Sequence, residues 1–248
     1  MIFNLKAMKQ IYLAVLLTIV TIFGCFNNKI VEEPKVLSGN GLQALILSAI
    51  SSDKKANDSL SGLIDLEVAE NNDYNSIEVD SFYLDNMKYF SVLLEYPNPI
   101  YNRFAVYDSL ANCFLIDKSL NGSLSFEVIE LQDLTFLKVI ERFISKDTLS
   151  LSRLSFYKKN NKSINLVYRS FAELKTLKKH FYQTINFISE DSIKTQILVP
   201  KKYKLNVKED VFVFDSIHKE YRSNQSLFDR LVYKEIADFD FEILKPQI

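Results

Sequence analysis

Three carboxylates near the end of the chain have the spacing of one strand face. Asp238, Asp240 and Glu242 alternate with apolar residues. Alternate side chains of a β-strand point to the same side, so the three acids could bind calcium or supply an acid/base pair. The same alternation is typical of any half-buried strand whose polar side meets water. A solvated strand face is therefore the preferred interpretation.

The histidines and the serine–lysine pairs form no recognisable catalytic motif. His180 and His218 are the only two histidines, and a zinc site needs three or four ligands. The spacing S-x-x-K begins at Ser51, Ser155 and Ser216, but the motifs S-D-N and K-T-G, which accompany it in penicillin-binding enzymes, are missing. The five glycines form no phosphate-binding loop. The sequence thus predicts no catalytic, cofactor-binding or metal-binding residue.

Cys25 follows a segment with the composition of an export signal. Lys6 and Lys9 give a basic start, residues 11–23 are uncharged and mostly apolar, and Gly24 precedes the cysteine. A basic region, an apolar region and a small residue at the cut are typical of a secretory signal peptide. A cysteine thiolate is also the side chain that can attack a phospholipid-derived diacylglyceryl donor, which serine could not replace.

The run Ile22-Phe23-Gly24-Cys25 resembles the lipobox of bacterial lipoproteins. The resemblance implies that residues 1–24 are a lipoprotein signal peptide, and that Cys25 becomes the acylated first residue, carrying chains such as palmitate. Two or three acyl chains anchor a protein stably, whereas one holds it only marginally. The chain is then expected in the bacterial cell envelope, attached to the membrane through its lipid. In enteric lipoproteins, an aspartate directly after the lipidated cysteine favours retention in the inner membrane. Residue 26 is a phenylalanine, so the resemblance implies the outer membrane.

Two other interpretations of this segment stay open. An uncleaved membrane span needs about 18 or more apolar residues, and the run from Ile11 to Phe26 is shorter. An ordinary signal peptide with an incidental cysteine is the second alternative. Translation could also start at Met8, which would give a signal peptide of normal length and leave the prediction for Cys25 unchanged.

Composition limits the remaining classes. Lys and Arg number 30 against 31 Asp and Glu, so the chain has no basic surplus of the kind that nucleic acid binding requires. A hydrophobic content of 48% is ample for a buried core. With Cys25 acylated, only Cys113 remains, which excludes an intrachain disulfide. Its apolar neighbours favour a buried structural role.

The periodicity predicts one β-rich domain over residues 39–248, after a flexible tether at 25–38. Apolar spacings of three and four predict a helix from the N-cap Asn40 to Ile50. Asn121-Gly122 predicts a two-residue hairpin turn. Residues 227–236 fit a helix or a further strand equally well. Alternating runs predict strands at 63–68, 77–84, 89–96, 104–107, 113–116, 123–131, 135–144, 149–156, 164–170, 181–188, 193–199, 211–214 and 239–243.

Strands that follow one another through short turns favour antiparallel pairing. The expected fold is an antiparallel β-sandwich, or a half-open curved barrel with a short N-terminal helix and one C-terminal helix at most. The second shape is similar to the unclosed barrels of some envelope lipid-carrier lipoproteins.

A rigid loop between two tyrosines is the best candidate contact surface. Pro97 and Pro99 restrict the segment from Tyr96 to Tyr101, and exposed tyrosines make contact area at low entropic cost. We expect both rings to be exposed. The function hypothesis is a lipid-anchored, non-enzymatic binding or assembly module for an envelope protein or an apolar ligand. The alternative is an envelope hydrolase whose site is assembled from distant residues.

Overall fold

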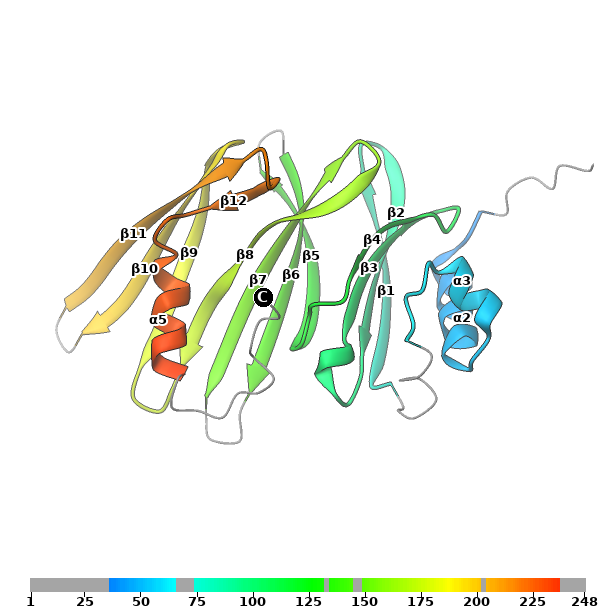
Figure 1. The fold of residues 1–248 in the computed structure, drawn as a ribbon, viewed down its shortest axis with the longest axis horizontal. Helices are drawn as coiled ribbons and strands as arrows, with labels where there is room; N and C mark the ends of the chain where they lie inside the picture. The colour runs from blue at the N-terminus through cyan, green and yellow to red at the C-terminus, as the bar shows by residue number, and fades with distance from the viewer. Residues whose placement is uncertain (1–35, 66–73, 132–133, 145–148, 202–203, 237–248) are drawn as a thin grey trace, which may run out of the picture. The chain divides into compact units, whose positions relative to one another are not determined.

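The computed structural model describes residues 36–65, 74–131, 134–144, 149–201 and 204–236, and strands make up most of these ranges (Figure 1). The helices are α2 (Gly39–Ile50), α3 (Lys54–Ser59), the short 3-10 helix η1 (Pro99–Tyr101) and α5 (Leu227–Ile236). The strands are β1 (Ser76–Leu84), β2 (Met87–Glu95), β3 (Arg103–Asp108), β4 (Cys113–Asp117), β5 (Ser123–Leu131), β6 (Leu134–Ile144), β7 (Ser150–Asn160), β8 (Ser163–Lys175), β9 (His180–Ser189), β10 (Ser192–Lys201), β11 (Lys204–Asp215) and β12 (Glu220–Arg222).

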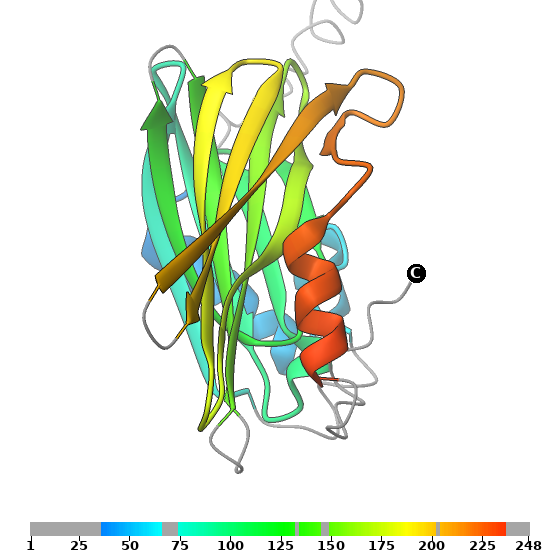
Figure 2. The same ribbon diagram turned by 90° about the vertical axis from the view of Figure 1, so that its left-hand side faces the viewer.

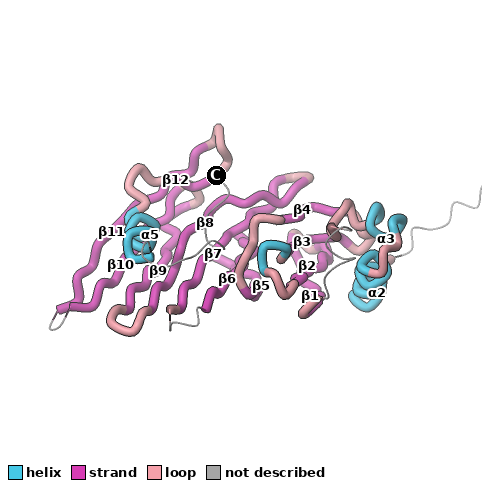
Figure 3. The backbone as a smooth tube through the Cα atoms, turned by 60° about the horizontal axis from the view of Figure 1, so that its bottom comes forward, coloured by secondary structure: helices cyan, strands magenta, loops and turns pink. Residues whose placement is uncertain are grey.

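Every strand pairs antiparallel with its neighbour in sequence, except where the chain passes from β4 to β5. Strands β1–β4 form a four-stranded sheet, and β5–β12 form an eight-stranded sheet (Figure 3). Short connections allow only antiparallel pairing, because a parallel pair needs a long crossover. The prediction of a mainly β, antiparallel fold is confirmed.

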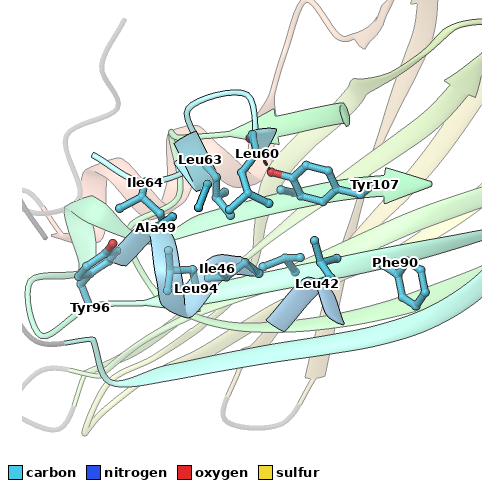
Figure 4. Close-up of a cluster of buried hydrophobic side chains, with 13 residues drawn as sticks. Leu42, Ile46, Ala49, Leu60, Leu63, Ile64, Phe90, Leu94, Tyr96 and Tyr107 are labelled. Carbon is cyan, nitrogen blue, oxygen red and sulfur yellow. Dashed lines mark hydrogen bonds between the residues drawn. The ribbon is translucent and has the colours of Figure 1, made fainter. Parts of the chain in front are cut away.

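The four-stranded sheet is covered on both faces. In β2, Phe90, Val92 and Leu94 join the buried cluster of α2 and α3, which Figure 4 shows in close-up. Tyr89 and Leu93 belong to a second cluster, shared with the first strands of the eight-stranded sheet. Successive side chains of a strand point to opposite faces, so β2 reads as a continuous apolar run. This layering is the sandwich-like part of the fold.

The eight-stranded sheet is strongly coiled in its second half. Strand β12 returns to contact β8 without pairing with it, so the curl stays open, and α5 lies along β8 (Figure 2). Seven aromatic residues fill the space inside the curl: Phe136, Phe156, Tyr168, Phe187, Phe212, Phe214 and Tyr221. Below them, α5 buries Phe228, Val232 and Ile236 against the lower part of the sheet. The space enclosed by the coiled sheet is thus packed with aromatic side chains.

The helices agree with the periodicity but differ at their ends. Ser38, not Asn40, caps α2, and its hydroxyl accepts from the Gly41 amide at 3.1 Å. Asp53 caps α3, a short helix that the periodicity did not predict. Residues 227–236 form a helix rather than a strand. None of the helices in the described ranges is long and apolar enough to cross a membrane.

The predicted hairpin at Asn121-Gly122 is wrong. The two residues lie between β4 and β5, which belong to different sheets, and neither has a positive φ. Glycine stands at 122 for another reason, since a Cβ there would lie 3.0 Å from the Arg142 carbonyl oxygen. A two-residue hairpin with two positive φ angles, as a type I′ turn requires, occurs instead at Asp85 (50°) and Asn86 (62°), between β1 and β2.

The strand predicted at 63–68 is also wrong where the structure describes it. Leu63 and Ile64 are buried in a turn, because the Asn57 side chain binds both the amide and the carbonyl of Ile64, at 3.0 and 2.9 Å. The rest of that segment lies outside the described residues. So do the strand expected at 239–243, the signal peptide and Cys25.

Candidate functional site

The loop between Tyr96 and Tyr101 does not present two exposed rings. Tyr96 is only 3% exposed and lies among the side chains of the α2–α3 cluster (Figure 4). Tyr101 is half-buried and packs against the same cluster. Their ring centroids are 6.3 Å apart in an edge-to-face contact. The expected exposure of Tyr96 is therefore wrong. Tyr96 continues the even-numbered face of β2, so the strand period points its ring into the core.

Asn102 and Arg103, which follow this loop, form hydrogen bonds within the fold. The Asn102 side chain accepts from the Tyr96 amide at 2.8 Å and donates to the Gly122 carbonyl at 2.8 Å. The Arg103 guanidinium donates to the carbonyls of Ile100 and Asn102. Asn102 and Arg103 are both buried. These contacts fasten the loop to the segment that joins the two sheets, which is a structural role.

A pocket of about 430 Å³ opens at the upper end of the coiled sheet. It lies where three turns meet: β7–β8, β9–β10 and β11–β12. Val167 and Phe214 supply its apolar floor, at the end of the aromatic core. We call it the mouth pocket. Its volume is within the range of small-molecule sites.

Cations dominate the rim of the mouth pocket. Lys158 pairs with Glu190 at 2.5 Å, and both line the pocket. Lys159 pairs with Asp85 at 2.7 Å, and that hydrogen bond raises the pKa of the ammonium. Lys219 is exposed and has no ion-pair partner in the part of the chain that the structure describes. An apolar floor below a mostly cationic rim suits an amphipathic anion.

The three S-x-x-K pairs have separate structural settings. Ser51 donates to the Leu47 carbonyl, and Ser155 is buried and accepts from Arg169 at 2.7 Å. Ser216 and Lys219 both line the mouth pocket, but no hydrogen bond joins their side chains. A serine nucleophile needs its base within hydrogen-bond reach.

Charged side chains gather in the buried junction between the two sheets. Glu141, which is fully buried, pairs with Arg153 through two bonds of 2.6 and 2.7 Å. Asp117 accepts from Tyr157 at 2.6 Å and pairs with Arg169. We call these five residues the junction network. Their opposite charges compensate one another, and the Asn121 amide donates to Glu141, so the network ties the connecting segment to the sheet.

The pKa shifts in the junction network follow from these contacts. Burial acts to raise the pKa of Asp117, but the Arg169 charge and the bonds from Ser119 and Tyr157 outweigh it and lower the pKa. Burial, with Asp117 beside it, raises the pKa of Tyr157. Both groups are thereby held in their ordinary neutral-pH forms, as a structural tie requires.

The other candidate residues are dispersed. His180 lies 2.7 Å from Glu173, and His218 lies 2.6 Å from Asp215, both at exposed positions. Among the described residues, no three His, Cys, Asp or Glu side chains gather as a metal site would need. Cys113 is half-buried rather than fully buried, and burial raises the pKa of its thiol. Asp238, Asp240 and Glu242 fall outside the described ranges.

Sequence reasoning missed the mouth pocket because its residues come from three separate turns. Lys158, Glu190 and Lys219 are ordinary turn-flanking charges in sequence. Only the coiling of the sheet brings them together.

The chain matches no known protein family, no curated protein and no solved structure.

Proposed function

We propose that this protein is a lipid-anchored protein of the bacterial envelope that binds a ligand or partner and catalyses no reaction. The anchor rests on Cys25, which follows a basic start, an apolar run and Gly24. In this proposal, acylation of the cysteine holds the chain to the outer membrane, and the tether at 25–38 lets the β-domain stand away from the lipid.

The mouth pocket is the observation that supports binding. Val167 and Phe214 offer apolar contact, and the ammonium group of Lys219 favours a negative charge, while Lys158 and Lys159 are already paired with Glu190 and Asp85. The preferred ligand is an amphipathic anion whose apolar part meets the floor. Carriage of a lipid inside the curl has less support, because aromatic rings fill that space.

An anionic fluorescent amphipath tests this site. 8-Anilinonaphthalene-1-sulfonate should bind the folded protein with a Kd that rises about fivefold or more in Lys219→Ala, since a charged contact contributes roughly 1 kcal/mol or more. Lys54→Ala, which removes an exposed lysine on α3, is the matched control and should leave the Kd unchanged. An equal Kd in all three proteins would refute the mouth pocket as the binding site.

The hydrolase alternative rests on one observation, the presence of Ser216 and Lys219 in the same pocket. If Ser216 were a nucleophile, p-nitrophenyl butyrate would be hydrolysed with a burst that Ser216→Ala abolishes. We expect no Ser216-dependent hydrolysis. A burst that disappears in the variant would replace the binding proposal with the enzymatic one.

A further inference from the structure

The turn between β8 and β9, residues 175–181, is a basic tip that carries an apolar side chain. We call it the hairpin tip. Leu177 is 81% exposed, and lysines stand at 175, 178 and 179. The tip encloses a hollow of about 520 Å³ at the lower end of the sheet, opposite the mouth pocket. Single exposed leucines are common on protein surfaces and need no explanation. A leucine flanked by lysines, however, matches the apolar and cationic groups that bind the interface of an anionic membrane.

The hairpin tip is held in shape by its own hydrogen bonds. The Thr176 amide donates to the Lys179 carbonyl at 2.7 Å. The Thr176 hydroxyl accepts from the amides of Lys178 and Lys179, at 3.3 and 3.0 Å. These bonds fix the turn, so Leu177 projects from a preformed loop. Little conformational entropy would be lost when the tip meets a surface.

Two of the lysines make no ion pair with any residue that the structure describes. Lys179 pairs with Glu235 of α5, and His180 pairs with Glu173. Lys175 and Lys178 are exposed, and neither has an ion-pair partner in the ranges that the structure describes. The exposed charge at the tip is therefore positive.

A second exposed apolar residue lies in line with the tip. Ile144, at the end of β6, is 82% exposed. Strand register places it beside Ser150, Ser150 beside Lys175, and Lys175 beside His180. Directly paired residues share a face, so Ile144 and Lys175 lie on one side of the sheet at one end. The apolar and cationic groups thus form one continuous edge.

We propose that the hairpin tip docks onto a bilayer that contains anionic phospholipids. Leu177 enters the interfacial region, and the ammonium groups of Lys175 and Lys178 pair with headgroup phosphates. Charge complementarity and the exposed aliphatic side chains at the same edge favour a lipid surface over a protein partner. This inference goes beyond the proposed function and does not depend on acylation of Cys25.

A tryptophan reporter can test the docking, because the chain contains no tryptophan. Leu177→Trp places the reporter at the tip. Leu110→Trp is the matched control, since Leu110 is 45% exposed in the β3–β4 turn of the four-stranded sheet and lines neither the hairpin tip nor the mouth pocket. Both variants are full-length chains purified in the same way as the parent protein. They are mixed with vesicles of phosphatidylglycerol and phosphatidylcholine, whose brominated acyl chains act as quencher. Equal melting temperatures of the two variants and the parent protein verify that the fold is kept.

Bromolipid should quench the Leu177→Trp variant at least threefold more than the Leu110→Trp variant. Adding Lys175→Gln and Lys178→Gln should reduce that quenching severalfold, and so should vesicles of phosphatidylcholine alone or high salt. Inorganic phosphate should displace the tip from the vesicles no better than chloride at the same ionic strength, because the docking needs the lipid surface as well as the charge. Stronger displacement by phosphate would indicate a site for free phosphate and would overturn the docking. Equal quenching at both positions, or quenching that ignores lipid charge, would overturn the docking.

Discussion

At the scale of single residues, Gly122 is the position where the structure most changes the expectation from sequence. The Asn-Gly pair indicated a positive φ, whereas the glycine is required by crowding. A Cβ would lie 3.0 Å from the Arg142 carbonyl oxygen and 3.1 Å from its amide nitrogen. Backbone atoms cannot give way as the end of a flexible side chain can. The constraint is therefore steric rather than conformational.

Gly122→Ala should lower the free energy of unfolding by about 1–3 kcal/mol, the usual cost of overpacking. Gly39→Ala is the control, because its nearest neighbour would be 3.7 Å away and alanine favours a helix. Urea unfolding of both variants measures the difference. Equal stability of the two would show that the connection at 122 is not tightly packed.

The pair of Glu141 and Arg153 gives a second residue-scale prediction. Arg153→Met leaves the fully buried Glu141 without its partner, and breaking a buried pair costs about 3–5 kcal/mol. Lys194→Met breaks a surface pair with Glu209 and should lower the free energy of unfolding far less, because solvent-exposed ion pairs contribute little. Adding Glu141→Leu to Arg153→Met should recover much of the loss. A loss for Arg153→Met no larger than for Lys194→Met would contradict the structural role of the junction network.

At the scale of elements, α5 is held to β8 by the half-buried carboxyl of Asp229. Asp229, in the first turn of the helix, accepts from the Ser170 hydroxyl at 2.8 Å and the Phe171 amide at 2.9 Å. Burial raises the pKa of Asp229, against these bonds and the Arg153 charge, and Asp210 adds to the rise. Since the folded pKa lies above the unfolded one, the native state loses stability relative to the unfolded state as pH rises from about 4 through the folded pKa.

Asp229→Asn should remove this pH dependence and keep the helix docked, because both bonds reach the same oxygen, Oδ1. The melting temperature of the variant relative to the parent should therefore rise between pH 4 and pH 7. Asp58→Asn, at an exposed position in α3, is the control and should show no such trend. A relative melting temperature that stays constant or falls with pH would contradict a raised pKa at Asp229.

The strands from 77 to 199 and the first helix were predictable, because each is an alternating, continuous or helically spaced apolar run that ends at turn residues. The burial of Tyr96 was also predictable, because Tyr96 continues the even-numbered face of β2, whose side chains point into the core. The crossing from β4 to β5 was not predictable, because no local pattern distinguishes a hairpin turn from a connection between sheets. The mouth pocket also depends on long-range coiling, which residues such as Lys219 do not encode locally.

At the scale of the whole molecule, the two candidate surfaces lie at opposite ends of the eight-stranded sheet. The mouth pocket contains the β7–β8 turn, and the hairpin tip follows the other end of β8. Strand β8 has 13 residues, which corresponds to roughly 40 Å. A domain that rests on its hairpin tip would hold the mouth pocket about that far from the lipid, open to the surrounding compartment.

Acylation of Cys25 is the central claim, because the anchor decides where the protein acts. The measurement is incorporation of labelled palmitate, with partition into Triton X-114 detergent, in cells that express the parent protein or Cys25→Ala; Cys113→Ala is the matched control. The parent and Cys113→Ala should carry label and enter the detergent phase, and Cys25→Ala should remain an unlabelled precursor. Equal labelling of Cys25→Ala, or an unlabelled parent protein, would contradict the account.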